Sequence, residues 1–459
     1  MKSVRRFVLA FVSAVFVLSG CSGGNQAGLT PAAGANGSFS ADTLSRKYVK
    51  HVVILVQENR SFDNFFATFP GADGATFGYT HKGKKIMLVK SPLASADINH
   101  DWKTFLAECD LQGSTCKMDG FDLAKIGGNN PGGNYAYRYV DPAQIQQYWT
   151  IAQQYALLDH MFQTQGSGSF TAHQDLIAGG TAIDSTNSLV DYPNESADWG
   201  CDAPAGTITS LITVDDIFKQ WKGPFPCLNY PTGTMRDLLD AKKVSWKYYS
   251  PLYHPKQGGA GALWNAFAAI DAVRNGPEWT TNISMPQTNI CKDIDSGTLP
   301  AVSWVIPDQL DSDHPQSKNQ IDTGPDWIAA VVNKIGQSSY WNSTAVVIVW
   351  DDWGGFFDHV APKQYASGEL GFRVPAMVVS PYINAGTISH TPFEFGSILK
   401  FVEQTFGLGS LHTSDVRAAS IGSIFSFKKP ARTFSAIPTK DSCDYFIKRP
   451  PSYQPVDTE

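Results

Sequence analysis

The stretch His51-Val-Val-Ile-Leu-Val56 contains five consecutive aliphatic residues and runs directly into the polar segment Gln57-Glu-Asn-Arg-Ser-Phe-Asp63. An uninterrupted apolar run of this length is typical of a strand that is buried on both faces. Late in the chain, Ala345-Val-Val-Ile-Val-Trp350 repeats the pattern and is followed by Asp351-Asp-Trp-Gly-Gly355. The two stretches predict two buried strands whose carboxyl ends both lead into acidic loops.

The rest of the chain alternates between strand and helix patterns. We expect further strands at 156–158, 244–249, 302–306 and 374–380, and helices at 144–154, 264–274, 327–335 and 395–405. This alternation predicts an α/β fold with a mixed, mainly parallel central sheet flanked by helices. The stretch from about 180 to 300 is rich in Trp, Pro and Gly, and is expected to be an irregular insertion that covers an edge of the sheet or its site.

The first 21 residues have the pattern of an export signal. Positive residues precede an apolar run at 7–18 that is too short to span a bilayer. The run ends in Leu18-Ser-Gly-Cys21, which resembles a bacterial lipobox, in which the cysteine is lipidated; the alternative is an ordinary cleaved signal with a chance cysteine. We therefore expect an exported protein. It is either a lipoprotein that Cys21 anchors to a membrane, facing the periplasm or the cell surface, or a secreted protein.

Composition and charge limit the partners of the mature protein. Residues 22–46 are rich in Gly, Ala, Ser and Asn and predict a flexible tether, followed by a single domain over 47–459. The 459 residues include 36 Lys and Arg against 42 Asp and Glu, a net charge of −6 that becomes −9 without the leader. This surface is not expected to favour nucleic acid or anionic lipid headgroups.

Cysteine usage agrees with export. Six of the seven cysteines remain when Cys21 is set aside, and an even number suits three disulfides in an oxidising compartment. The sequence separations favour the pairs Cys109–Cys116 and Cys201–Cys227, which leaves Cys291 with Cys443. Because no C-x-x-C pair occurs, a zinc site made of thiolates is not expected.

Polar residues gather directly after the two strongest predicted strands. Ligands of open α/β sheets bind outside the carboxyl ends of strands, so Glu58, Asn59, Asp351 and Asp352 converge if the two strands are parallel neighbours. Three carboxylates and an amide oxygen would repel one another without a cation between them, and all-oxygen ligands suit a hard divalent ion, Ca²⁺, Mg²⁺ or Mn²⁺. The alternative is that Asn59 or Ser61 caps the next helix and the two aspartates start a turn.

A third polar segment, Gln165-Gly-Ser-Gly-Ser-Phe-Thr-Ala-His173, leads into a predicted helix. A hydroxyl at a helix N-terminus lies in positive potential, which lowers the cost of an alkoxide and helps to hold a phosphate; the alternative is a serine N-cap. The segment does not fit G-x-S-x-G, so a nucleophile elbow is not supported. Four histidines in polar contexts are candidates for proton transfer: His100, His254, His314 and His359. Any one of them alone is more often structural.

Four sets of residues then point to a family. They are Val52–Asn64; Asn99–Trp102 with Lys117–Phe121; Ser312–Pro315; and Trp350–Val360. Together they resemble, in order and from about 47 to 410, the bacterial phosphoesterase family of phospholipases C and acid phosphatases. The resemblance implies an alkaline-phosphatase-like α/β fold and the hydrolysis of phosphate esters.

The resemblance also implies roles for individual residues. One divalent metal ion is expected on the positions that match Glu58, Asn59, Asp351 and Asp352, joined by the hydroxyl of the nucleophile. The alignment through Ile177-Ala-Gly179 places that nucleophile at Ser169, with Thr171 as the alternative because Gly168 and Thr171 stand where prolines are expected. The positions that match the histidines of the family's phosphate site are His100, His314 and His254.

The implied reaction proceeds through a phosphoseryl intermediate. Because the chain ends soon after the last match, an acid-phosphatase-like activity of broad specificity is favoured. The alternative is a phospholipase C, which releases diacylglycerol and a phosphorylated headgroup. A lesser alternative is an inactive, substrate-binding lipoprotein on the same fold; such proteins usually lose a ligand or the nucleophile, and none is missing here.

Overall fold

The computed structural model describes residues 41–127, 130–194, 198–215, 217–225, 227–254, 259–315, 323–365, 369–428, 430–453 and 456. All of them belong to one compact unit, Phe39–Glu459. The predicted leader, the predicted lipid-modification residue Cys21 and the tether up to residue 40 lie outside the described residues.

The end of the predicted tether is helical. Helix α1 spans Ala41–Tyr48, so the prediction of a flexible segment over 41–46 is wrong. Two contacts hold the helix on the domain: the Arg46 guanidinium donates to the backbone carbonyl of Gln404 at 2.8 Å, and the Tyr48 ring stacks on Phe427.

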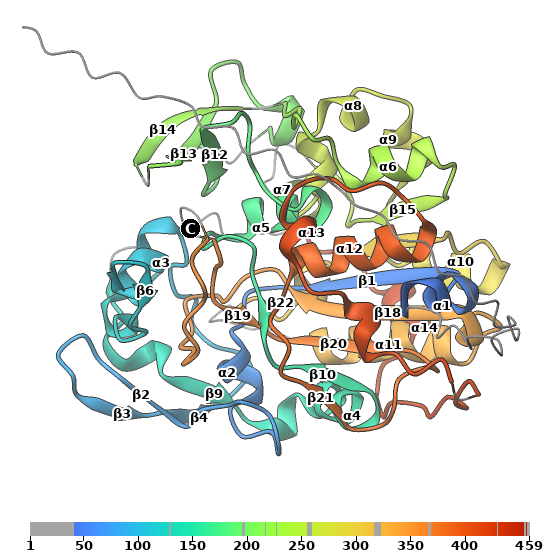
Figure 1. Ribbon diagram of the computed structural model, residues 1–459, viewed down its shortest axis with the longest axis horizontal. Coiled ribbons are helices and arrows are strands. Elements are labelled where there is room, and N and C mark those ends of the chain that lie inside the picture. Colours follow the sequence, from blue (N-terminus) through green and yellow to red (C-terminus); the bar gives the residue numbers. More distant parts are fainter. Residues whose placement is uncertain are drawn as a thin grey trace, which may run out of the picture. The chain divides into compact units, whose positions relative to one another are not determined.

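An eight-stranded sheet forms the centre of the unit (Figure 1). Its strands are β1 (His51–Gln57), β10 (Ala156–Leu158), β15 (Trp246–Tyr249), β16 (Ile283–Ser284), β17 (Val302–Val305), β18 (Thr344–Trp350), β20 (Ala376–Val379) and β21 (Thr387–Ser389). The order is β16-β15-β17-β1-β18-β20-β10-β21, and only the two pairings of β20 with β18 and β10 are antiparallel. The predicted mixed, mainly parallel sheet is confirmed.

The two aliphatic stretches of the sequence are neighbours in this sheet. β1 and β18 are parallel, with Gln57 paired to Trp350, and every residue of both strands except His51 is buried. The backbone N–H of Asp351 extends the ladder by donating to the carbonyl of Gln57 at 2.9 Å. This register brings the residues that follow β1 next to those that follow β18.

Two groups of helices flank the sheet (Figure 1). One contains α1, α5 (Ser169–Ala178), α12 (Phe395–Phe406) and α13 (Ser414–Arg417), and the other contains α4 (Gln146–Gln154), α10 (Asn289–Ser296), α11 (Gly324–Gly336) and α14 (Cys443–Lys448). The remaining helices are α2 (Phe62–Phe66), α3 (Trp102–Cys109), α6 (Met235–Ala241), α7 (Ala260–Leu263), α8 (Asp271–Arg274) and α9 (Glu278–Thr281). No helix among the described residues has the length and hydropathy needed to cross a bilayer.

The continuous helix predicted at 264–274 is wrong. A 3₁₀ helix at Ala266–Ala269 and the short α8 replace it, with Ile270 in extended conformation between them. Leu228 pairs with Ile270 as a strand would: its N–H donates to Ala269 at 2.7 Å and its carbonyl accepts from Asp271 at 3.2 Å. This pairing uses backbone groups that a continuous helix needs for itself.

The irregular stretch from about 180 to 300 contains a small antiparallel sheet and two strands of the main one. The small sheet consists of β12 (Asn187–Val190), β13 (Ile208–Thr213) and β14 (Phe218–Pro224). β15 and β16, from the same stretch, extend one edge of the central sheet.

Short strands make up the rest of the fold. They are β2 (Phe77–Tyr79), β3 (Lys85–Met87), β4 (Val89–Ser91), β5 (Leu111–Gln112), β6 (Thr115–Cys116), β7 (Lys125–Ile126), β8 (Asn130–Pro131), β9 (Arg138–Val140), β11 (Met161–Phe162), β19 (Arg373–Val374) and β22 (Phe393–Glu394). A second apolar cluster, which includes Phe121, Tyr137 and Phe357, packs among the segments between β2 and β9 and the loop after β18.

All three predicted disulfides are present. They join Cys109 to Cys116, Cys201 to Cys227, and Cys291 to Cys443. The last of these connects α10 to α14 across a sequence separation of 152 residues. The pairing fits a chain that folds in an oxidising compartment.

Candidate active site

The loops that follow β1 and β18 are tied together by their backbones. The N–H of Asn59 donates to Asp351 Oδ1 at 2.9 Å, and the N–H of Arg60 donates to the carbonyl of Asp352 at 2.9 Å. Asn59 has a left-handed backbone, with φ of 57°. Gly354, with φ of 61°, lies so close that a Cβ there would be 2.2 Å from the Asn59 carbonyl oxygen. Glycine at this position is therefore required for the two loops to meet.

Ser169 is the first residue of α5 and faces these loops. Its Oγ donates to Asp352 Oδ2 at 3.1 Å and lies 3.4 Å from Asn59 Oδ1. The N-cap residue of α5 is Gly168, which has no side chain with which to cap the helix. Thr171, the alternative nucleophile, donates instead to the carbonyl of Gly168 at 3.2 Å. Ser169 is thus the hydroxyl that meets the acidic loops.

His173 joins the same site, although the sequence did not single it out. Its Nε2 lies 3.1 Å from Glu58 Oε1 and 3.7 Å from Asp351 Oδ2. Burial lowers the pKa of His173 to about 4, so the ring is neutral near pH 7. The signal that could have found it is its spacing of four residues from Ser169, which puts both side chains on one face of α5.

Two predicted histidines approach this site with defined ring orientations. His100 Nδ1 lies 2.7 Å from the carbonyl of Ile98, so Nδ1 carries the hydrogen, and Nε2 lies 2.6 Å from Asn59 Nδ2 and 3.7 Å from Asp352 Oδ2. The His314 ring is centred 6.4 Å from that of His100 and stacks on Trp264. Both histidines are buried.

Residues of the first motif position His314. The Gln57 side chain donates to the carbonyl of Asp311 and accepts from the N–H of Asp313, both at 2.9 Å. The Arg60 Nε donates to the carbonyl of Asp313 at 2.8 Å. The strand end that carries Glu58 and Asn59 therefore also fixes the backbone next to His314.

His254 is the one predicted site histidine for which no contact with these groups is recorded among the described residues. It is half-buried, and its ring meets the edge of Tyr453 with centroids 4.6 Å apart. The residues that follow it, 255–258, lie outside the described part of the chain. Its role at the phosphate site stays a prediction.

The donor set fits a divalent cation. The ligand atoms of Glu58, His173 and Asp351 lie within 4.8 Å of one another, and all three side chains are buried. Asp351 Oδ2 has no hydrogen-bond partner among the described residues, because the N–H of Asn59 takes Oδ1. A buried carboxylate oxygen without a donor is costly unless a cation balances it.

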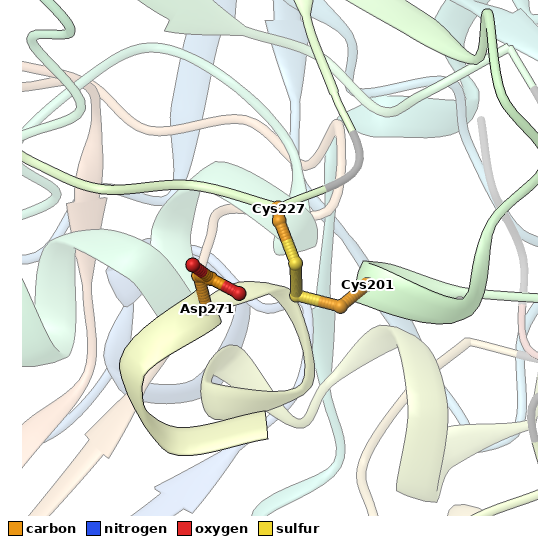
Figure 2. Close-up of side chains that lie close together, drawn as sticks. All are labelled: Cys201, Cys227 and Asp271. Carbon is orange, nitrogen blue, oxygen red and sulfur yellow. A yellow bond between two sulfur atoms is a disulfide. The ribbon is translucent and has the colours of Figure 1, made fainter. Parts of the chain in front are cut away.

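A second group of possible ligands, Cys201, Cys227 and Asp271, does not have the chemistry of a metal site (Figure 2). The two sulfur atoms are bonded to each other in a disulfide. Metal binding by cysteine needs the thiolate, which a disulfide does not offer.

A model of the Phosphoesterase family matches residues 49–409. The chain belongs to that family. It is a hydrolase that acts on phosphoric ester bonds. The match runs from β1 to the end of α12 and so contains all the site residues described above.

Individual relatives of this phosphoesterase are phospholipases. It is 25% identical to a non-hemolytic phospholipase C of Pseudomonas aeruginosa, over 87% of this chain and 60% of that protein. It is 25% identical to phospholipase C B of Mycobacterium tuberculosis, over 86% of this chain and 80% of that one. A solved Vibrio parahaemolyticus protein of the alkaline phosphatase superfamily is similar, with a TM-score of 0.37, 11% identity and coverage of 81% and 71%. The chain thus spans about three fifths of the length of the Pseudomonas relative.

A third acidic group in the phosphoesterase is already neutralised by an arginine. Asp63 and Asp358 also follow β1 and β18, but further along the chain than Glu58 and Asp351 do. Both lie close to His359. The buried Arg373 guanidinium donates to both oxygens of Asp358 at 2.8 and 3.0 Å and lies 3.5 Å from Asp63. These residues join the two motif loops to each other, and His359 is part of that network rather than of the site around Ser169.

We expect the His359→Asn variant to lose more stability in mild acid than in mild alkali. Burial opposes protonation of His359, but its hydrogen bond to Asp63 at 2.6 Å and the nearby carboxylates outweigh burial and raise its pKa above the usual 6.5. Because the folded-state pKa is the higher one, this histidine stabilises the fold below the unfolded-state pKa. The contribution is lost as the pH rises through the folded-state pKa.

Urea unfolding of both proteins at about pH 6 and about pH 8.5 measures the difference. The charged groups around His359 are Asp63, Asp73, Asp358 and Arg373. A destabilisation that is equal at both pH values would show that protonation of His359 contributes nothing.

Proposed function

We propose that this protein is a metal-dependent phosphoesterase in which Ser169 is the nucleophile. The observation that carries the proposal is the position of Ser169 Oγ at the start of α5, 3.1 Å from Asp352 Oδ2 and 3.4 Å from Asn59 Oδ1. Asp352 accepts the hydrogen bond of the hydroxyl, and the helix N-terminus favours negative charge on the oxygen and on a phosphate beside it. The helix N-terminus therefore favours an alkoxide at Ser169, and Asp352 is placed to take the proton of the hydroxyl.

In the proposed reaction, Ser169 Oγ gives its proton to Asp352 and attacks phosphorus in line with the leaving oxygen. The bond from phosphorus to the leaving oxygen breaks, and a bond from phosphorus to Ser169 forms. His100 and His314 hold the phosphoryl oxygens, and one of them delivers a proton to the leaving oxygen. Water then hydrolyses the phosphoseryl ester, which releases the phosphate product and restores the serine.

Five residues would hold one divalent cation: Glu58, Asn59, Asp351, Asp352 and Ser169. When bound, the ion would lower the pKa of the serine hydroxyl and offset the charge that develops on the phosphoryl group. His173 adds a nitrogen at the edge of this otherwise all-oxygen set. Since imidazole suits transition metals and carboxylates suit Ca²⁺, Mg²⁺ and Mn²⁺, we rank Mn²⁺ first among the three ions expected from the sequence.

For the substrate, we rank phospholipids above small phosphate monoesters. The relatives reported above are named phospholipases C, and phospholipase C was one of the two activities expected from the sequence. An acid-phosphatase-like activity of broad specificity is the second candidate, because the same site chemistry serves any phosphate ester that reaches Ser169. An inactive binding protein is disfavoured, because every residue of the predicted metal and nucleophile set is present.

Phosphatidylcholine and p-nitrophenyl phosphate, assayed side by side with the metal-loaded protein, test this ranking. We expect diacylglycerol and phosphocholine from the lipid, with a kcat/KM above that for the monoester. A higher kcat/KM for p-nitrophenyl phosphate would establish the phosphatase instead. Hydrolysis of neither substrate would favour the inactive binding protein.

We also propose that the protein acts outside the cytoplasm. The leader-like residues 1–21, with Cys21 as the predicted lipid attachment, support export, and the three disulfides suit an oxidising compartment. Labelling with a radioactive fatty acid, which a Cys21→Ser variant should not incorporate, tests the lipid attachment.

A further inference from the structure

The hairpin formed by β2 and β3 carries positive charge on an otherwise acidic chain. From Gly74 to Ala96 the sequence has four lysines and no aspartate or glutamate, while the whole chain has a net charge of −6. Lys82, Lys84 and Lys85 are exposed, and no ion pair is recorded for them within the described residues. Lys90, the fourth, pairs with Asp141 at 2.9 Å. Three lysines are therefore available to an anionic surface.

The same hairpin exposes large apolar side chains. Of the thirteen exposed large hydrophobic residues recorded in the described chain, four lie within 77–89: Phe77, Tyr79, Met87 and Val89, which are 36%, 48%, 58% and 63% exposed. Such a concentration in one short segment marks an interaction surface.

Lys85 shares one face of the hairpin with the apolar side chains, and Lys82 and Lys84 lie at the turn that joins the two strands. β2 and β3 are antiparallel, with Phe77 opposite Met87 and Tyr79 opposite Lys85. Lys85 Nζ lies 3.7 Å from the centre of the Phe77 ring. Aromatic rings among lysines on a convex, exposed element suit the boundary between lipid headgroups and acyl chains.

The opposite face of the hairpin is packed firmly against the domain. A Cβ at Gly78 would lie 2.4 Å from the ring of Phe357, so only glycine allows this approach. The Tyr137 hydroxyl donates to the carbonyl of Tyr79 at 2.7 Å. Phe357 belongs to the loop that begins with Asp351 and Asp352. A surface bound to the hairpin is thus linked through that loop to the candidate active site.

We propose that the face of the β2–β3 hairpin, made of Phe77, Tyr79, Lys85 and Met87 with Lys82 and Lys84, docks on bilayers that contain anionic phospholipids. From the negative net charge we expected a surface that does not favour anionic lipid headgroups. The net charge sums over the whole chain and therefore hides this local cluster of lysines. Lysines near an anionic bilayer are attracted to its surface, and the aromatic and apolar side chains add buried area. Binding to vesicles is a property separate from phosphoester hydrolysis. It can be measured without any catalytic turnover.

Co-sedimentation with vesicles of phosphatidylcholine, with and without phosphatidylglycerol, tests the docking. The full chain carries Cys21→Ser, so that no acyl chain is attached there, and the readout is the gain in binding that phosphatidylglycerol gives. We expect this gain to fall about tenfold or more in Lys82→Glu/Lys84→Glu, because both attractions become repulsions. Phe77→Ser/Met87→Ser should weaken binding to both kinds of vesicle.

The matched control is Lys219→Glu/Lys222→Glu, which makes the same change in net charge on exposed positions of β14, away from the hairpin in Figure 1. An equal loss of binding in this control would show that net charge alone acts, and would overturn the proposal. The proposal would also be overturned if the hairpin variants bound phosphatidylglycerol vesicles as well as the parent does.

Hydrogen exchange localises the contact and does not depend on any variant folding. Amides of residues 77–89 should exchange more slowly with phosphatidylglycerol vesicles present, and unchanged exchange there would contradict docking. Hydrolysis of soluble p-nitrophenyl phosphate should be the same in all variants, since none of these residues is in the site. A parent that hydrolyses neither p-nitrophenyl phosphate nor phosphatidylcholine would argue against the proposed function and leave the docking result intact.

Discussion

Replacement of Ser169 by alanine is expected to lower kcat by about 10⁴-fold to 10⁶-fold, the loss typical of a missing nucleophile. The hydroxyl is the group of this residue that meets Asp352 and Asn59, so the variant should fold normally. Single-turnover assays with p-nitrophenyl phosphate and with phosphatidylcholine measure the rate, and thermal unfolding checks the fold. Acid quench of the parent during turnover should trap phosphate on Ser169.

Thr171→Ala is the matched control, since its hydroxyl is two residues away on the same helix but donates to the carbonyl of Gly168. We expect this variant to keep most of its activity. Full activity in Ser169→Ala, or loss of trapped phosphate only in Thr171→Ala, would move the nucleophile to the threonine.

The second large effect is expected from Asp351→Asn, which should remove the metal ion. Asparagine keeps an oxygen for the N–H of Asn59 but cancels the charge that Oδ2 presents toward Glu58 and His173. Metal affinity should fall by about 100-fold or more, at least the loss seen when residues that merely orient ligands are changed. Metal content after dialysis, measured by inductively coupled plasma spectrometry, reports the loss without an activity assay.

Asp175→Asn provides the control for removal of a buried carboxyl group. Asp175 lies on α5, where burial raises its pKa well above the ordinary range, and its carboxyl oxygens have no hydrogen-bond partner among the described residues. This variant should keep its metal. If Asp351→Asn retains the parental metal content while Asp175→Asn loses it, the proposed ligand set is wrong.

The sequence was sufficient to predict the centre of the fold because the central strands are aliphatic along their whole length. β1 and β18 are buried on both faces, so their side chains are hydrophobic without alternation. Parallel pairing of two such strands then places whatever follows them at one edge. The proximity of Glu58 and Asp351 follows from that rule.

Other features depend on contacts between residues that are distant in sequence. The break at Ile270 is made by Leu228, and α1 is ordered by Gln404 and Phe427, none of which leaves a local signal. Helix α5 begins at Ser169, so the residue four positions later lies on the same face of the helix. His173 faces the site for that reason. The four-residue spacing from Ser169 was the one signal in the sequence, and lone histidines in helices are too common for it to single out His173.

The position of β18 late in the chain has a consequence for the timing of activity. Ser169, His100 and Glu58 are all synthesised long before Asp351 and Asp352, which the fold places beside β1 only after three quarters of the polypeptide has been made. A chain that stops before residue 351 therefore contains Ser169 but lacks Asp351 and Asp352. In the reaction proposed above, such a chain would be inactive, because two of the carboxylates that would hold the metal ion are missing.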